Sequence, residues 1–280
     1  MIATTPKPTR WQEIRTLADF YPIQMKYASI ITVQYPMAAI LWLISLVVEP
    51  TIYLVVWSTI AREQGGTVGG FTAGTFAAYY IAWTAVRVMN ISLTPWAFEG
   101  RVQRGEWSPM LVRPIHPFHQ DLAFFIGMKV RDMAYLVPII ALLVLAFKPE
   151  LNPTWWQILA FLVAIFTGFV MRFIWLWFLG LITFWITRIA AVFDLYFAIE
   201  LLLSGRVVPI DLLPNWAQTI SNWLPYQWSF GFPIEVILGR LTVQETLMGF
   251  GMQLLWAVVG WILMMILWRE GVKKYSAVGA

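Results

Sequence analysis

Six long apolar stretches constrain the fold of this chain more than any other feature of its sequence. A helix needs about 20 apolar residues to cross the ~30 Å hydrocarbon core of a bilayer. Only 12% of the 280 residues are charged and 60% are hydrophobic, which is too little charge for the surface of a soluble domain. We therefore predict an all-α membrane protein with six transmembrane helices, at residues 37–60, 71–95, 121–147, 155–186, 190–209 and 246–268.

Basic residues in the connections between these helices predict the orientation of the chain. One set of connections carries eleven of them, namely Lys7, Arg10, Arg15, Lys26, Arg101, Arg104, Arg113, Arg188, Arg269, Lys273 and Lys274. The other set carries four, namely Arg62, Lys148, Arg206 and Arg240. Because cytoplasmic loops are enriched in Lys and Arg, we expect both termini in the cytoplasm. The domains are then a cytoplasmic segment (1–36), a transmembrane domain (37–268) and a cytoplasmic tail (269–280).

The N-terminal segment contains an amphipathic pattern. Its apolar residues Trp11, Ile14, Ala18 and Tyr21 recur at helical spacing, with charged residues on the other faces. This predicts a helix lying in the inner membrane interface, ended by Pro22. The alternative is an unstructured basic tail.

A polar island interrupts the apolar sequence at residues 96–120. We expect Pro95 to close the second span and Gly105 to stop the short helical end that follows it. Ser108 then resembles an N-cap and Pro109 the first position of a second short helix. This coupling helix would present Met110, Leu111 and Val112 beside three arginines, which suits the docking of a partner protein. The alternative is an ordinary positively charged loop.

We expect the segment 204–242 to lie on the opposite side of the membrane from the termini. It is too apolar for a solvated loop and too rich in proline for one spanning helix, which predicts short re-entrant helices packed on protein. We expect these helices to form a lid over the outer end of a pathway, with Pro214 and Pro225 as tethers. Its aromatic residues are Trp216, Trp223, Tyr226 and Trp228. The alternative is an interfacial loop with an aromatic belt.

Ionisable residues inside the predicted spans are expensive and therefore either paired or functional. Two acids and two bases lie at comparable depths, with Asn90 as a further hydrogen-bonding partner; they are Glu49, Arg87, Arg172 and Glu200. We favour internal pairing over direct contact with a substrate, and the sequence leaves open which acid meets which base. Lys129, Arg131 and Asp132 are expected to extend to the inner interface.

Motifs for catalysis are absent from the sequence. It lacks the G-x-x-x-x-G-K-[ST] phosphate loop, so we expect any ATP hydrolysis to occur on a separate polypeptide. It has no cysteine, and the spacing of His116 and His119 between prolines favours loop residues over metal ligands. The chain is therefore expected to be neither an enzyme nor a metal-binding protein, and its small net charge does not indicate nucleic-acid binding. An intramembrane enzyme or a passive channel stays a distant alternative.

Three segments together carry a resemblance that covers essentially the whole chain. They are GRVQRGEWSPMLVRPIHPFHQDL (100–122), SGRVVPIDLLPNWAQTISNWLPYQWSFGFPIEVILG (204–239) and WREGVKKYSAVGA (268–280). The chain resembles the membrane subunit of bacterial type-2 ABC exporters, most closely the group described as ABC-type transport system permeases. The resemblance implies six spans, an N-terminal interfacial helix, a coupling helix between spans two and three, and re-entrant helices before span six.

The resemblance also implies partners and a function. The coupling helix would fit a cleft in a cytoplasmic ATPase subunit that carries ATP and Mg, through Glu99, Arg101, Arg104, Glu106, Met110, Leu111 and Arg113. Two permease subunits would face each other in the plasma membrane of a bacterium, as a heterodimer slightly more readily than a homodimer. By alternating access they would export an amphipathic, lipid-like or drug-like substrate; export of a polysaccharide or glycolipid is the alternative.

Overall fold

The computed structural model describes residues 10–31, 36–186 and 188–275, and most of them are helical. The predicted segments 1–9 and 276–280 lie outside the described residues. The elements are α1 (Arg10–Ile31), α2 (Pro36–Glu63), β1 (Thr67–Val68), β2 (Phe71–Thr72), α3 (Ala73–Asn90), α4 (Pro95–Gln103), α5 (Trp107–Leu111), α6 (Pro117–Phe147), α7 (Trp155–Gly180), η2 (Leu181–Phe184), α8 (Ala190–Leu203), η3 (Ile210–Leu212), α9 (Asn215–Trp223), α10 (Pro225–Ser229), α11 (Gly231–Ile237) and α12 (Val243–Lys274).

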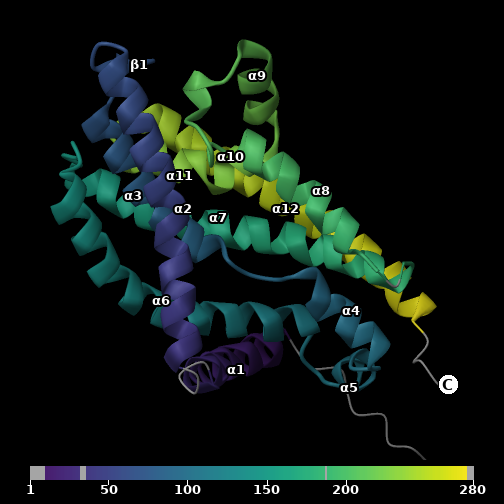
Figure 1. Cartoon of the computed structure of the whole chain (residues 1–280). Coiled ribbons are helices and arrows are strands. Elements are labelled where there is room, and N and C mark those ends of the chain that lie inside the picture. The colour runs from purple at the N-terminus through teal and green to yellow at the C-terminus, as the bar shows by residue number, and fades with distance from the viewer. Residues whose placement is uncertain (1–9, 32–35, 187, 276–280) are drawn as a thin grey trace, which may run out of the picture.

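Three described helices are long and apolar enough to cross a membrane. They are α6, α7 with its 3₁₀ extension η2, and α12, which match the predicted spans 121–147, 155–186 and 246–268. The sequence starts α7 and α12 with capping boxes, formed by Thr154 with Gln157 and by Thr242 with Glu245. Helix α7 packs against α12, α11, α10 and α3 and forms the centre of the molecule (Figure 1).

The other predicted spans are less regular. Helix α2 covers the predicted span 37–60, but α3 has 18 residues and α8 only 14, or about 27 and 21 Å of helix. Helix α8 is thus shorter than the ~30 Å hydrocarbon core, and it ends six residues before the predicted limit at residue 209. The count of six spans stays a prediction.

A short antiparallel hairpin joins α2 to α3 within this mostly helical chain. Strands β1 and β2 pair through Val68 and Phe71. The turn between them consists of Gly69 and Gly70, which have φ angles of 55° and 82°. A two-residue hairpin turn of this type needs positive φ at both positions, which glycine adopts without steric cost.

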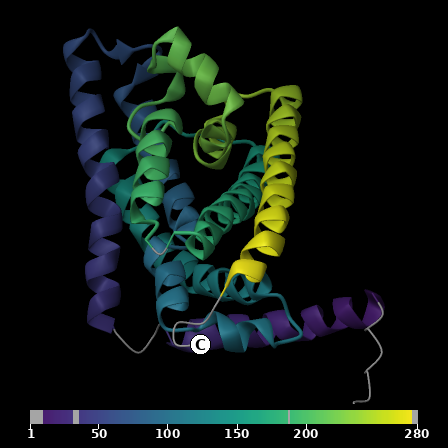
Figure 2. The same ribbon diagram turned by 90° about the vertical axis from the view of Figure 1, so that its right-hand side faces the viewer.

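Helix α1 lies across the base of the molecule, crosswise to α2 and α12 (Figure 2). The prediction that Pro22 ends this helix was wrong, because α1 continues to Ile31. Its second half packs along α6, where Ala28 is fully buried and the Ser29 hydroxyl donates to the carbonyl of Gly127 over 3.0 Å. This packing offsets the cost of a proline inside a helix, which is ~3 kcal/mol. The interfacial location of α1 stays a prediction.

Gly127 permits the close approach of these two helices, and its replacement by alanine tests the contact. A Cβ atom there would overlap the backbone of Met25. We expect Gly127→Ala to displace α1 and to lower the free energy of unfolding by ~1–3 kcal/mol, measured by thermal unfolding and by limited proteolysis of α1. Gly251→Ala is the matched control, because a Cβ atom at Gly251 meets open space. An equal response of both variants would contradict the packing of α1 on α6.

Candidate functional site

Three regions of the structure contain the residues that the sequence singled out. We call them the island (residues 96–120), the central charge cluster (Glu49, Arg87, Arg172, Glu200 and Arg206) and the outer pocket beneath the short helices of residues 204–242.

The island consists of α4 and α5, joined by a turn at Gly105. The prediction that Pro95 closes the preceding span was wrong. Helix α3 already ends at Asn90, and Pro95 opens α4 at the first helical position. Gly105 stops α4 as predicted, with a φ of 67°. Helix α5 begins at Trp107, so Ser108 is not its N-cap, and the Ser108 hydroxyl instead lies 3.1 Å from the hydroxyl of Tyr275.

Aromatic packing positions α5. The Trp107 ring is fully buried and contacts the rings of Phe98, Phe184, Trp177 and Trp268, at centroid distances of 5.3 to 6.2 Å. Its burial, rather than a polar cap, sets the start of this short helix. The island is thereby held rigidly on α7 and α12.

His116 closes the island and caps α6. Its Nδ1 accepts from the backbone N–H of Phe118 over 3.2 Å, and its ring packs 4.5 Å from that of Trp268. Burial, with a smaller contribution from His119, lowers the pKa of His116 to about 4, so the ring is neutral at physiological pH. Its observed role is structural.

Three of the seven predicted contacts face into the chain. The Glu99 carboxylate accepts from the backbone N–H groups of Ile189 and Ala190 and so caps α8. Arg101 pairs with Asp121, with contacts of 2.6 and 2.7 Å, and Met110 is buried. These side chains are engaged within the chain.

The other predicted contacts reach the surface. Arg104 donates to the Glu106 carboxylate over 2.6 Å, and both side chains are exposed. Arg113 is also exposed and Leu111 is half-buried. Val112, next to them, is 85% exposed. An exposed valine beside charged side chains forms a small apolar surface with a charged rim.

The central charge cluster pairs the four ionisable residues that the sequence placed at similar depths. Arg172 donates two hydrogen bonds to Glu200, of 2.7 and 2.8 Å, and a third of 2.6 Å to the backbone carbonyl of Asn90. The Glu49 carboxylate forms an ion pair with the Arg87 guanidinium, at a distance of 2.8 Å. The structure thus pairs these side chains within the chain, Arg172 with Glu200 and Arg87 with Glu49, whereas their contact with a substrate stays untested.

Arg206 joins this cluster from the chain that follows α8, and the sequence analysis missed it as a site residue. It lies 2.9 Å from Glu49 and 5.7 Å from the centre of the Trp83 ring. In the sequence, Arg206 lies at an interruption of the predicted span 190–209 and carries no further signal of this role. Asp121 was missed too, although it opens a predicted span and accepts hydrogen bonds from Arg101 and Trp177.

The prediction that Lys129 and Asp132 extend to the interface was wrong. Both are buried, and the Lys129 ammonium donates to the carbonyl of Val88 over 2.7 Å. Arg131 donates to Asp132, which lies between the two cations. These side chains turn inward because the buried end of α3 offers a carbonyl and the carboxylate is held by both bases.

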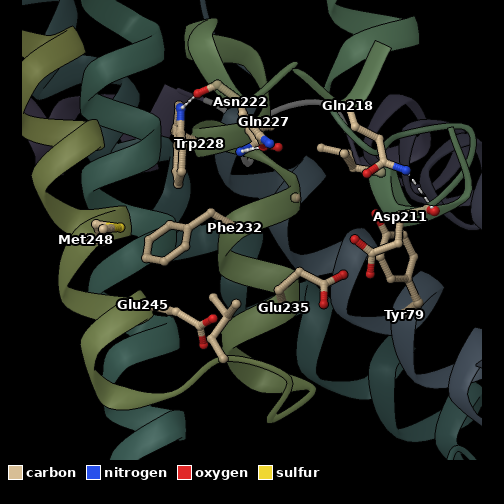
Figure 3. A pocket seen from close by; sticks show the side chains of 13 residues that line it. Tyr79, Asp211, Gln218, Asn222, Gln227, Trp228, Phe232, Glu235, Glu245 and Met248 are labelled. Atoms are coloured by element: carbon tan, nitrogen blue, oxygen red, sulfur yellow. Dashed lines mark hydrogen bonds between the residues drawn. The ribbon is translucent and has the colours of Figure 1, made fainter. Parts of the chain in front are cut away.

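The outer pocket, of about 330 Å³, lies between the short helices and α12 (Figure 3). The short helices are present as predicted, as η3, α9, α10 and α11. Of the predicted lid aromatics, Trp228 lines the pocket and Tyr226 packs 5.1 Å from Tyr196, whereas Trp216 and Trp223 are exposed. Asp211, Glu235 and Glu245 also line the pocket.

Most of the chain is similar to one family of known proteins. A family model described as ABC-2 family transporter protein matches residues 47–279. No curated protein matches the chain. The matched region includes the island, the central charge cluster and the outer pocket, and excludes α1.

Proposed function

Because the chain belongs to the ABC-2 transporter family of membrane proteins, we propose that it is the permease subunit of an ATP-driven exporter. ATP and Mg are bound by a separate ATPase subunit, and this chain moves a substrate outward across the plasma membrane of a bacterium. The substrate is amphipathic, lipid-like or drug-like. Both termini face the cytoplasm, with six membrane spans in each subunit.

The exposed surface of the island is the observation that carries this proposal. Arg104, Glu106, Val112 and Arg113 are exposed, while Trp107 and Arg101 fix the backbone that carries them. Partner surfaces commonly combine an apolar contact with a charged rim, and rigid support lowers the entropic cost of binding. The ATPase subunit binds this surface.

Two permease subunits form the pathway. One coupling surface serves one ATPase, and alternating access needs two facing halves. A heterodimer is slightly favoured over a homodimer. The central charge cluster lies along the pathway of each subunit, and the short helices of 204–242 form its outer lid.

Replacing Val112 with aspartate tests the coupling surface. We expect at least tenfold weaker association with the ATPase subunit, because the variant places a charge in the apolar centre of the interface. The tagged full chain is purified from its host membranes, and the ATPase that co-purifies is quantified together with its ATP turnover. The ATPase subunit that co-purifies with the wild-type chain must hydrolyse ATP.

Val243→Asp provides the matched control at the other end of the molecule. Val243 is exposed and opens α12, where an acidic residue is favourable, so this variant is expected to behave as the wild type. Normal association and normal ATP turnover in Val112→Asp would overturn the assignment of the island.

A further inference from the structure

A central cavity of about 220 Å³ adjoins the central charge cluster. Its polar lining comes from three helices and two non-helical segments: Arg87, Asn90, Ser92, Thr94, Arg172, Glu200 and Arg206. The rings of Phe197 and Phe230 complete the wall, and each lies within 5.6 Å of the Arg172 guanidinium. The cavity thus combines polar groups with an aromatic wall.

Non-helical backbone lines this cavity. Helix α3 ends at Asn90, and the next four residues, 91–94, run to α4 without regular structure (Figure 1). At membrane depth, backbone outside a helix is tolerated only where it packs in protein or borders a polar cavity. All four residues line the central cavity. The break in the helix therefore places backbone polar groups at the cavity.

The charges around the cavity do not balance. Three guanidinium groups, of Arg87, Arg172 and Arg206, are paired with only two carboxylates, of Glu49 and Glu200. The neighbouring group on α6 adds no compensation, because Lys129 and Arg131 share the single acid Asp132. An excess positive charge in a low-dielectric region is costly without a counter-ion. The cavity therefore favours an anion.

Unpartnered polar atoms indicate what the anion carries. Among the described residues, buried Nη1 of Arg87, Oδ1 of Asn90 and Oγ of Ser92 have no hydrogen-bonding partner. Asn90 is only 2% exposed, and its amide nitrogen already donates to the carbonyls of Val86 and Ser229. Its free oxygen requires a donor, whereas Arg87 requires an acceptor. Buried polar groups are nearly always satisfied in native proteins.

We infer that the central cavity binds the headgroup of an anionic amphiphile, namely a phosphate ester that also carries a hydroxyl group. The phosphate oxygens accept from Arg87, and the hydroxyl donates to Asn90. The volume is below the ~300–1,000 Å³ of pockets that enclose drug-sized ligands. The cavity thus holds the headgroup while the acyl chains stay outside it. This inference rests on the proposed transport function, for which it names the substrate class.

Binding of short-chain lipids to the purified full chain tests the inference. Dihexanoyl phosphatidylglycerol carries a phosphate and free hydroxyls, whereas dihexanoyl phosphatidylcholine is zwitterionic and has no hydroxyl donor in its headgroup. Titrations in a nonionic detergent, read by native mass spectrometry, give the two affinities. We expect phosphatidylglycerol to bind at least tenfold more tightly.

Variants of one arginine locate the site. Arg87→Gln is expected to weaken phosphatidylglycerol binding about tenfold, the effect of a lost hydrogen bond to a charged group. It leaves phosphatidylcholine binding unchanged. Arg206 still pairs with Glu49 in this variant, which preserves the fold. Arg87→Lys, which keeps the charge, restores part of the affinity. Arg62→Gln removes the same charge from an exposed position and is expected to change nothing.

Three results would overturn the inference. The first is equal affinity for the two lipids, and the second is an equal effect of Arg87→Gln and Arg62→Gln. The third is binding of soluble glycerol 3-phosphate as tight as that of phosphatidylglycerol, which would assign the cavity to a free phosphate compound. The assay contains no ATPase, so these results bear on the cavity alone. The proposed function fails independently, if Val112→Asp leaves ATPase association intact.

Discussion

Glu200→Gln is expected to lower the free energy of unfolding by ~3–5 kcal/mol, because it leaves the Arg172 guanidinium buried without its counter-charge. The Glu200 side chain is 1% exposed and accepts two hydrogen bonds from Arg172. The pair joins α7 to α8, and Arg172 also holds the end of α3 through the carbonyl of Asn90. Thermal unfolding of the detergent-solubilised protein should show a midpoint lowered by roughly 10 °C.

Two further variants separate charge from packing at this pair. Glu63→Gln makes the same chemical change at an exposed position and should leave the midpoint unchanged. The double variant Arg172→Met with Glu200→Gln removes the orphaned charge and should recover most of the lost stability. If Glu200→Gln alone unfolds at the wild-type temperature, the pair does not hold these helices together.

Asp121→Ala is expected to be similarly destabilising, by ~3–5 kcal/mol, since the carboxylate balances the half-buried Arg101 guanidinium. Asp121 accepts from both terminal nitrogens of Arg101 and, over 2.8 Å, from the indole N–H of Trp177. These contacts tie α4 to α6 and α7. The island should therefore lose its fixed position, and ATPase association should fall even though Asp121 lies beneath the exposed surface.

A double-mutant cycle checks this interpretation. Arg101→Ala alone should also destabilise, and the double variant should cost no more than the worse of the two single variants. Asp211→Ala is the control: its carboxylate also pairs with an arginine, Arg240, but it is 56% exposed and should cost less than ~1 kcal/mol. Additive losses in the cycle would mean that Arg101 and Asp121 act independently.

The length of the apolar stretches predicted the long helices well, because the ability of a helix to span a bilayer depends on its length and composition. Helices α6, α7 and α12 begin within four residues of the predicted spans. The short helices of residues 204–242 were predicted for a related reason, namely that proline-rich apolar sequence fits neither a span nor a solvated loop. These features need no knowledge of long-range contacts.

The errors occurred where a distant contact decides a local conformation. Pro22 fails to end α1 because α6 packs against the following turns. Helix α3 ends at Asn90, five residues before Pro95, where Arg172 takes its last carbonyl. Lys129 turns inward to a carbonyl of α3 rather than outward to the interface. Local propensity contains none of this information.

In the candidate site too, the sequence predicted what depends on local position and missed what depends on distant contacts. Depth along the predicted spans indicated that Glu49, Arg87, Arg172 and Glu200 should pair, because an isolated charge is too costly there. Partner identity depends on how the helices are arranged, and so does the recruitment of Arg206 from outside a helix. Which island residues face the surface likewise depends on Trp107, whose burial sequence periodicity does not reveal.

The chain around Arg206 connects the central charge cluster to the outer segment. Arg206 holds Glu49 in the central charge cluster, while the next residue, Val207, accepts through its carbonyl from Trp57 and Tyr80, and Gly205 accepts from Tyr79. Three residues after Arg206, the outer segment continues into Pro209 and η3. Glu49 pairs with both Arg87 and Arg206, so an anion bound to Arg87 would change the contact that holds Arg206 and, with it, the outer segment. By thermodynamic reciprocity, a displacement of that segment would change the affinity for the anion by the same factor.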